Sequence, residues 1–337
     1  MLQELFVRLV SPVFATINAQ HRYFSFYLLF AALMALGIVY SRQRADERSI
    51  AAALANVFQR KIFLHPSALL DYRFALTNHI LFVMVLGLML LGASTVTGVV
   101  HSGLTYVLGA ASPAIAGVTA GIVFTIALFM VTDFANFGGH YIQHKVPVLW
   151  EFHKVHHSAE VLTPITAIRL HPVSEIFSTQ IIATGMGLVN GIFLYIYSGP
   201  VAEATVLGAN ALDFLYYTIG AYHLSHSHIW VMFPKGIREV FLSPALHLIH
   251  HSSDPRHFDK NFAFSLTIWD RLAGTLYMPQ DHEQHTLALG IGEQERDYKT
   301  VWQLYTTPLR NTARILGMMR SNTAGNANAA EPAKALV

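Results

Sequence analysis

The chain has 337 residues, of which 53% are hydrophobic and 12% are charged, and its formal net charge is +2. Soluble domains carry roughly 25% charged residues, so this composition, with a mean hydropathy of +0.41, excludes an ordinary soluble protein and predicts an integral membrane protein. The small net charge argues against nucleic acid as a partner. The absence of cysteine excludes disulfides, thiolate metal sites and cysteine nucleophiles.

The N-terminal part of the chain alternates apolar and basic stretches. Residues 1–22 have the amphipathic character of a segment that lies on the membrane surface. Residues 23–40 are uncharged and bounded by tyrosines, which predicts a first membrane span. Residues 41–73 contain six Arg and Lys residues and form the most basic loop, and residues 74–100 predict a second span.

Three further apolar runs predict the remaining spans. The third, residues 114–137, leads directly to His140. The fourth and fifth, residues 176–198 and 201–222, are separated only by a Gly-Pro turn and predict a helical hairpin. Asp133 lies in the third run, where a carboxylate is costly. It is expected either to bind the second ring N–H of a ligand histidine or to be hydrated at the membrane surface.

The basic loop predicts how the chain is oriented. Since Arg and Lys accumulate in cytoplasmic loops, residues 41–73 should be cytoplasmic and the N-terminus should lie outside. Counting the spans onwards, residues 140–175 and everything from residue 223 should then also be cytoplasmic. All the histidine-rich stretches fall on this one side.

Histidine motifs are the strongest chemical signal in the sequence, which has 19 histidines. One HxxxH, two HxxHH and one HxxH pattern place imidazoles at helical spacings of three and four, so that each set shares one helix face. Neutral imidazole is the commonest side-chain metal ligand, and about ten donors are too many for one ion and suit two. The predicted ligands are His140, His144, His153, His156, His157, His223, His226, His247, His250 and His251.

The remaining histidines receive other expectations. His228 can replace His223 as the ligand from the third cluster, and His171 is expected to have a structural or supporting role. Lone histidines such as His65 and His101 are expected to pack without binding metal. The predicted fold is therefore an all-α integral membrane protein with about four to five transmembrane or hairpin helices and a cytoplasmic helical cap that carries a histidine-rich dimetal site.

These motifs together resemble the fatty acid hydroxylase / sterol desaturase superfamily. Asp133 before the first histidine, the Arg-x-His-Pro element that starts at Arg169, and residues 243–244, 259–262 and 269–275 are similar to further signatures of that superfamily. The resemblance covers about half of the chain. Phe137, Ala263, Ala273 and the late position of Glu175 after His171-Pro172 depart from the usual pattern and leave the substrate subfamily open.

The resemblance implies a membrane-bound diiron oxygenase that uses O2 and external electrons to hydroxylate or desaturate a lipid C–H bond. The catalytic residues would be the eight histidines of the HxxxH and the two HxxHH motifs. Zinc is expected to replace iron on purification in some preparations, because it accepts similar ligands. A histidine-rich membrane metal transporter and a non-catalytic lipid-binding member of the family are the alternatives.

The sequence also predicts a separate electron donor, because it has no GxGxxG motif, no cysteine for an iron–sulfur cluster and no fused cytochrome b5 motif. The donor would be a ferredoxin or a cytochrome b5-type carrier with its reductase. Its expected docking surface consists of basic residues on the cytoplasmic cap: Lys145, Lys154, Arg169, Lys235, Arg238 and Arg256.

Four segments are expected along the chain. Residues 1–112 would hold the N-terminal interfacial and transmembrane segments, and residues 113–280 the catalytic domain. Residues 281–320 would form a cytoplasmic extension. Residues 321–337, which are rich in Ala, Asn and Gly, would be a disordered tail.

Overall fold

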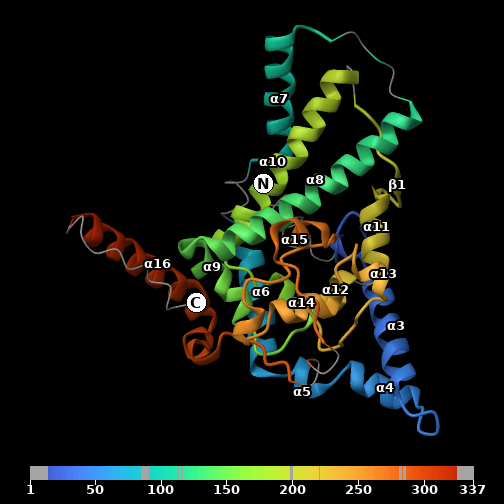
Figure 1. Cartoon of the computed structure of the whole chain (residues 1–337), viewed down its shortest axis with the longest axis vertical. Coiled ribbons are helices and arrows are strands. Elements are labelled where there is room, and N and C mark those ends of the chain that lie inside the picture. Colours follow the sequence, from blue (N-terminus) through green and yellow to red (C-terminus); the bar gives the residue numbers. More distant parts are fainter. Residues whose placement is uncertain are drawn as a thin grey trace.

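The computed structural model describes residues 14–84, 91–111, 114, 117–197, 200–219, 221–280, 283 and 286–324, which are mostly helical. Figure 1 shows the arrangement of the elements. The α-helices are α3 (Ser25–Arg42), α4 (Ile50–Val57), α5 (Arg60–Phe63), α6 (Pro66–Met84), α7 (Ala93–Leu108), α8 (Val118–Lys145), α9 (Pro147–His157), α10 (Pro172–Tyr197), α11 (Ala211–Thr218), α12 (Ala221–Ser225), α13 (Lys235–Arg238), α14 (Pro244–His250), α15 (Ile268–Ala273) and α16 (Val301–Ala324). The 3-10 helices are η2 (Pro164–Ile168), η3 (Pro255–His257) and η5 (Gly292–Tyr298), and the strands are β1 (Thr205–Val206) and β2 (Ala209–Asn210).

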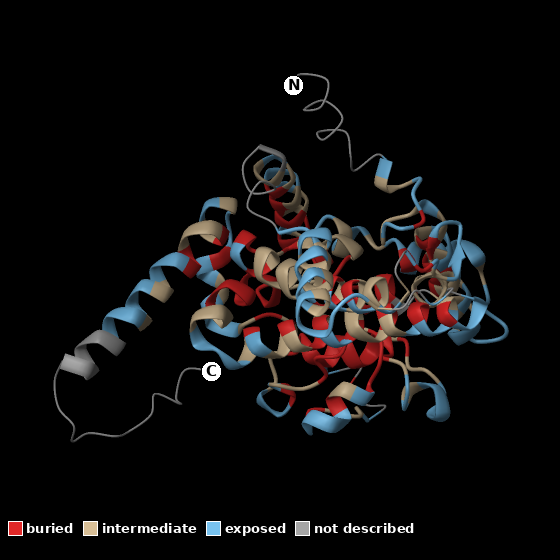
Figure 2. Cartoon of the chain, turned by 90° about the horizontal axis from the view of Figure 1, so that it is seen from above, coloured by how far each residue is buried: buried red, intermediate tan, exposed pale blue. Residues whose placement is uncertain are grey.

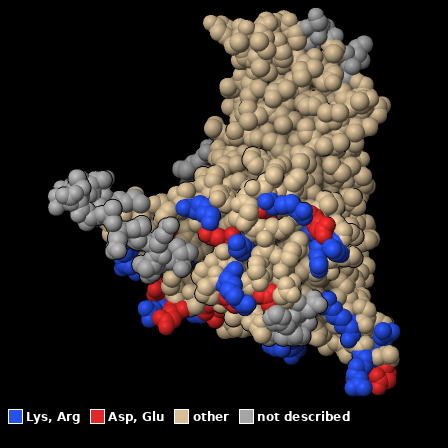
Figure 3. Space-filling model, in the orientation of Figure 1, with Lys and Arg blue, Asp and Glu red and all other residues tan. Residues whose placement is uncertain are grey.

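Within the described residues, three helices are long and apolar enough to cross a membrane: α3, α8 and α10. They correspond to the spans expected at 23–40, 114–137 and 176–198. The sequence has no Lys, Arg, Asp or Glu between Phe74 and Thr132 or between Ile176 and Ala202. In the view of Figure 3 the charged side chains accordingly gather in the lower half, whereas the upper part, which α7, α8 and α10 form, carries none. The chain is a membrane protein with one uncharged end.

Close backbone packing joins α7 to α10. A Cβ atom added to Gly187 would lie 2.4 Å from the Cβ atom of Val96, and one added to Gly191 would lie 2.6 Å from the Cβ atom of Val100. Glycines four residues apart on α10 therefore let the backbone of α7 approach closely, as small residues do between membrane helices. This contact sets α10 between α7 on one side and α8 on the other (Figure 1).

The second expected span differs from the structure. Residues 74–100 do not form one helix, because α6 ends at Met84, residues 91–92 are not helical and α7 begins after Gly92. The N-terminal half of α6 carries Asp71, which is fully buried in polar contacts with Arg169 and Thr166. An apolar run therefore does not specify a continuous helix when part of it packs against the polar end of the protein.

The fifth expected span is also different. In place of one helix, residues 201–219 form a short β1–β2 hairpin followed by α11. Leu207 and Gly208 have φ values of +52° and +87°, which is the left-handed conformation of a two-residue hairpin turn. Asn210 then caps α11 by accepting the N–H of Leu212 at 3.0 Å. The expected fourth and fifth helices are thus one membrane-length helix, α10, and a shorter return segment.

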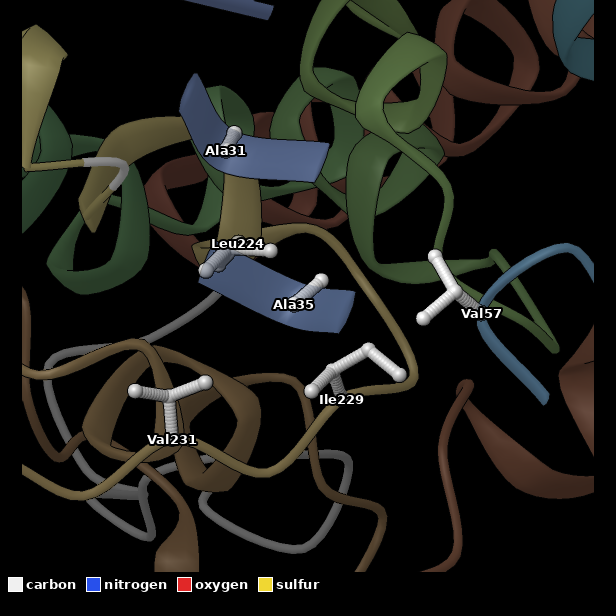
Figure 4. Packing of buried hydrophobic residues seen from close by; sticks show 6 residues of the cluster. All are labelled: Ala31, Ala35, Val57, Leu224, Ile229 and Val231. Atoms are coloured by element: carbon white, nitrogen blue, oxygen red, sulfur yellow. The ribbon is translucent and has the colours of Figure 1, made fainter. Parts of the chain in front are cut away.

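The buried residues gather in the interior of the molecule (Figure 2). Seven residues of α9 and all seven of α14 are among them. The helix α12 and the segment that follows it pack against α3 and α4. Ala31 and Ala35 of α3 and Val57 of α4 pack with Leu224 and Ile229, as Figure 4 shows. Because Leu224 and Ile229 flank His226, this packing fixes the position of that imidazole.

Parts of two expected terminal segments lie outside the described residues. These are residues 1–13 of the expected surface segment 1–22 and residues 325–337 of the expected disordered tail. Residues 321–324 of the expected tail belong to the last turn of α16.

Candidate metal centre

Nine of the ten predicted ligands lie in two adjacent groups. The first group contains His140, His144, His153, His157 and His250, and the second contains His156, His226, His247 and His251. Within each group one ring nitrogen from every histidine lies within 4.8 Å of the others. The structure therefore brings together residues that are more than a hundred positions apart in the sequence.

A sharp bend between α8 and α9 builds most of the first group. The helix α8 ends at Lys145, Val146 is extended, and Pro147 begins α9. Proline is favoured at this first helical position, because an N–H group there would have no partner within the helix and its absence costs no hydrogen bond. The bend places the last turns of α8, with His140 and His144, against the buried face of α9.

The helices α9 and α14 each contribute to both groups. On α9, His153 and His157 belong to the first group and His156 to the second. On α14 the assignment is reversed. His250 belongs to the first group, whereas His247 and the residue that follows the helix, His251, belong to the second. Each of these two helical segments therefore supplies histidines to both groups.

Backbone carbonyls orient two rings of the first group. The Nδ1 atom of His140 lies 2.9 Å from the carbonyl oxygen of Phe262, and that of His250 lies 2.8 Å from the carbonyl oxygen of Lys260. A carbonyl can only accept, so each Nδ1 carries the proton and each Nε2 keeps its lone pair. Both Nε2 atoms are buried without a hydrogen-bond partner among the described residues. This is the tautomer that binds a metal through Nε2.

Asp270 and Asn261 hold the segment that supplies these carbonyls. The carboxylate of Asp270 accepts the N–H groups of Phe262 and Ala263, each at 2.8 Å. Asn261 has a φ of +56° and is fully buried, and its side chain donates to the carbonyl oxygens of Leu246 and Tyr277. An asparagine tolerates this left-handed conformation better than most residues. The residues around positions 259–275 that resemble the family signature thus position two of the predicted ligands, His140 and His250.

Asp133 fulfils neither of its two expected roles. Its carboxylate accepts the backbone N–H groups of Ser265 and Leu266 at 2.8 and 3.1 Å and the indole N–H of Trp269 at 2.8 Å. It is 2% exposed, so it is not hydrated at the membrane surface, and none of its hydrogen bonds involves a histidine. Three donors compensate its burial. Asp133 therefore fastens α8 to the segment that ends in α15.

The donor set fits metal ions. In the second group the Nε2 atoms of all four histidines converge, with His226 and His247 at 3.0 Å and both His156–His226 and His247–His251 at 3.1 to 3.2 Å. A neutral imidazole has a single N–H, so four converging nitrogens cannot satisfy one another. In the first group both ring nitrogens of His153 are buried without a partner among the described residues. A cation in each group would satisfy these lone pairs.

The protonation states also suit metal binding. Burial lowers the pKa of His156 to about 3. Burial, with repulsion between neighbouring rings as a smaller cause, holds the pKa well below its usual value in a further set: His153, His157, His226, His247, His250 and His251. These imidazoles are neutral near pH 7, which is the form that ligates a metal.

The three further histidines for which the sequence predicts a role at the site lie outside both groups. His223 is buried beside the rings of Tyr222 and Tyr23, and its two ring nitrogens have no hydrogen-bond partner in the described part of the chain. His228, the alternative ligand, contacts the carbonyl oxygen of Asn56 at 2.9 Å. The Nδ1 atom of His171 accepts the N–H of Val173, and its Nε2 lies 3.3 Å from the carbonyl oxygen of Tyr305.

Two members of the expected basic docking surface are not on the surface. Arg169 is 1% exposed and donates to the carbonyl oxygen of Val155 at 2.9 Å and to Asp71 at 2.6 Å. Lys154 is 5% exposed and contacts Glu151 at 2.6 Å. The prediction of these two as docking residues is wrong, because each cation is satisfied by a buried carboxylate within the protein. Arg169 instead ties the last turn of α9 to α6.

Trp150 was not recognised from the sequence. Its ring lies 4.7 Å from that of His144 and 5.3 Å from that of His157, measured between centroids. It lines a cavity of about 150 Å³ beside the first group, together with Lys154 and Asp259. A tryptophan three residues before His153 and on the same helix was the available signal, since residues at this spacing share a face.

A second cavity, of about 170 Å³, reaches both groups. His140 and His153 of the first group and His156, His226 and His247 of the second line it. Much of its remaining wall comes from α8 and α10, two of the helices that are long enough to span the membrane. It is thus the space in which a molecule could meet both groups at once.

The fold and the site define a helical membrane protein with histidine-rich, metal-binding clusters. Residues 125–275 match the family model described as fatty acid hydroxylase, which confirms the resemblance seen in the motifs. The match covers 151 of the 337 residues, so the similarity to the fatty acid hydroxylase family is shown for this part of the chain.

Three relatives illustrate the similarity. Alkylglycerol monooxygenase of Danio rerio is 28% identical over 168 residues, which cover 50% of this chain and 33% of that protein. Ornithine lipid hydroxylase OlsE of Rhizobium tropici is 30% identical over 150 residues (44% and 40%), and human cholesterol 25-hydroxylase is 32% identical over 158 residues (46% and 50%). The matches thus span between a third and a half of the length of these relatives. No solved structure matches the chain.

Proposed function

We propose that this protein is a membrane-bound diiron oxygenase that uses O2 and externally supplied electrons to hydroxylate a C–H bond of a lipid. The observation that carries the proposal is the pair of adjacent histidine groups, five and four nitrogens each, that face one cavity. The three relatives, a monooxygenase and two hydroxylases, are named for the oxidation of a lipid or a sterol, which supports the same class for this chain.

The overall reaction balances as R–H plus O2 plus two electrons and two protons, giving R–OH and water. Iron held by the nine histidines would supply O2 activation, which no side chain can perform. The chain itself orients the imidazoles through the carbonyls of Phe262 and Lys260, and it keeps the rings neutral by burying them. The cavity, which α8 and α10 help to line, would admit one end of the lipid from the side of the bilayer.

A separate carrier, a ferredoxin or a cytochrome b5-type protein with its reductase, would deliver the two electrons. With Arg169 and Lys154 excluded, the remaining basic residues of the expected docking surface are Lys145, Lys235, Arg238 and Arg256, of which Arg238 is partly buried and the others are exposed. We place this surface and the histidine groups, within the catalytic segment 113–280, on the cytoplasmic side. The basic loop 41–73 supports that side.

Reconstitution tests the function. Iron-loaded protein in detergent, supplied with a lipid mixture, carrier, reductase and NAD(P)H under 18O2, should form a lipid that carries one 18O atom. His156→Ala should abolish this product, whereas His65→Ala and His101→Ala should retain it, because neither of those residues lies in a histidine group. Product formed from NAD(P)H alone would contradict the separate donor. Metal flux into vesicles without any oxidised lipid would favour a transporter instead.

A further inference from the structure

Two opposite charges face the cavity that reaches both histidine groups. Arg22, which stands just before α3, and Glu175, in the first turn of α10, both line it. The other lining residues are histidines and uncharged side chains. The wall of this cavity therefore carries one positive and one negative pole, and its formal charge sums to zero when the histidines are neutral.

Neither charge has a direct partner. Among the described residues, no hydrogen bond or ion pair is formed by the guanidinium of Arg22 or by the carboxylate of Glu175, although the two line the same cavity. By contrast, each of the buried cations Arg169 and Lys154 touches a carboxylate at 2.6 Å. Partly buried charges without partners are costly, so this arrangement favours an occupant that compensates both.

Both groups are nevertheless held in place. The guanidinium of Arg22 lies 5.8 Å from the ring centroids of Tyr23 and of Tyr222, which is within the range of a cation–π contact. Glu175 follows Pro172 at the N-terminus of α10, where the helix dipole favours a negative charge. Two positioned charges without partners are typical of a preformed binding site.

We propose that Arg22 and Glu175 bind the polar end of a lipid that carries both a negative and a positive group, the anion on Arg22 and the cation on Glu175. This inference rests on the proposed function and narrows its substrate class to zwitterionic lipids. A lipid with an uncharged polar end would form no charge-paired hydrogen bond with either residue.

The position of the oxidised carbon follows from the size of the cavity. At about 170 Å³ it is smaller than the roughly 300–1,000 Å³ of a pocket for a drug-sized ligand, so it accepts a polar end and not a whole lipid. The same small space contains His140, His153 and His247. The C–H bond that is oxidised therefore lies in or next to the polar end, and the acyl chains remain between the membrane helices.

Binding of four matched probes tests the proposal without any turnover. They are N-palmitoyl-lysine, with a carboxylate and an ammonium group, N-palmitoyl-norleucine, with the carboxylate only, N-palmitoyl-cadaverine, with the ammonium group only, and N-pentylpalmitamide, with neither. Affinities are measured on the unreduced, metal-loaded protein in an uncharged maltoside detergent. N-acetyl-lysine serves as a fifth probe that separates a lipid from a free zwitterion.

The wild-type protein should bind N-palmitoyl-lysine about ten- to a hundredfold more tightly than either singly charged probe, as expected for charge-assisted hydrogen bonds. Arg22→Gln should make the affinities for the lysine and cadaverine probes equal, because these two probes differ only in the carboxylate. Glu175→Gln should make the affinities for the lysine and norleucine probes equal, because these two probes differ only in the ammonium group. Arg48→Gln is the matched control, because Arg48 makes a similar contact with Tyr40 but is exposed, and Glu47→Gln is its acidic counterpart.

Equal affinity of the wild-type protein for all four acyl probes would overturn the proposal, even if both variants fail to fold. Binding of N-acetyl-lysine as tight as that of N-palmitoyl-lysine would overturn the lipid as its ligand. Selective binding without oxidation of any zwitterionic lipid would leave the charge recognition standing and would count against the proposed function alone.

Discussion

The ring of His140 on α8 and the carbonyl oxygen of Phe262 lie 2.9 Å apart, although 122 residues separate them in the chain. This contact fixes the tautomer of the histidine, and it depends on a backbone segment that Asp270 holds through two N–H groups. A carboxylate without any contact to the metal groups thereby determines which nitrogen of His140 points into the first group.

Replacing Asp270 with Asn should weaken the first group without removing a ligand. An amide cannot accept from both backbone N–H groups through two carboxylate oxygens, so we expect a loss of about 1–3 kcal/mol of stability. We also expect roughly ten- to a hundredfold weaker metal binding at the first group, as for other residues that orient ligands. Thermal unfolding and chelator competition measure the two effects. Asp46→Asn, at an exposed position, is the control, and unchanged metal affinity in Asp270→Asn would contradict this role.

Metal content should be two ions per chain, with iron in the active form. Elemental analysis after aerobic and anaerobic purification measures it, and zinc in place of iron is an acceptable result because it takes similar ligands. His153→Ala should lower the content towards one ion by impairing the first group, and His251→Ala should do the same through the second. His101→Ala should keep two. Less than one ion per chain under all conditions would refute the dimetal site.

The buried pair of Arg169 and Asp71 should be strongly coupled. Both side chains are at most 1% exposed, so Arg169→Met leaves an unpaired carboxylate and should cost about 3–5 kcal/mol. Asp71→Leu should also destabilise, and the double variant should cost clearly less than the sum. Denaturant unfolding in detergent gives the coupling energy. The pair Lys299–Glu160, in which the lysine is exposed and the glutamate partly exposed, is the control and should couple by about 0–1 kcal/mol. Equal coupling of the two pairs would contradict the prediction.

Membrane orientation can be read by cysteine labelling, because the chain has no cysteine of its own. Arg44→Cys and Arg296→Cys should be reached by an impermeant maleimide only after the cells are opened. Tyr106→Cys, at a position that is 91% exposed on the uncharged end, should be labelled in intact cells. Labelling of Arg44→Cys in intact cells would reverse the topology. The N-terminus, expected outside, can be tested in the same way with a cysteine at position 2.

The sequence was sufficient to find the nine histidines that the structure brings together, although not to exclude His223, because histidine spacing on a helix is visible in one dimension. His153 and His157, four residues apart, must share a face whatever surrounds them. The partners of those ligands could not be found in this way. The carbonyl oxygens of Phe262 and Lys260 have no side-chain signature, and the choice between two roles for Asp133 depended on which donors the distant residues 265–269 present to it.

The charge and hydropathy of the sequence distinguish polar from apolar segments, but they do not determine the burial of a residue or the secondary structure of a segment. Arg169 and Lys154 look like surface cations in the sequence, but whether a cation is exposed depends on the carboxylate that the fold brings to it, here Asp71 and Glu151. The apolar run at 201–222 likewise concealed a hairpin, because the left-handed turn at Leu207 and Gly208 has no effect on hydropathy.

The way in which α9 and α14 divide their histidines gives the centre an approximate twofold exchange symmetry. On α9 the pair His153 and His157 belongs to the first group and the single residue His156 to the second. At α14 the pair His247 and His251 belongs to the second group and the single residue His250 to the first. The remaining histidines break the symmetry. The helix α8 adds two nitrogens to the first group, whereas His226 adds one nitrogen to the second group. The first group thus offers five nitrogens and the second four, so two bound metal ions would be inequivalent, and a small molecule that enters the centre would meet fewer histidine nitrogens on the side of His226.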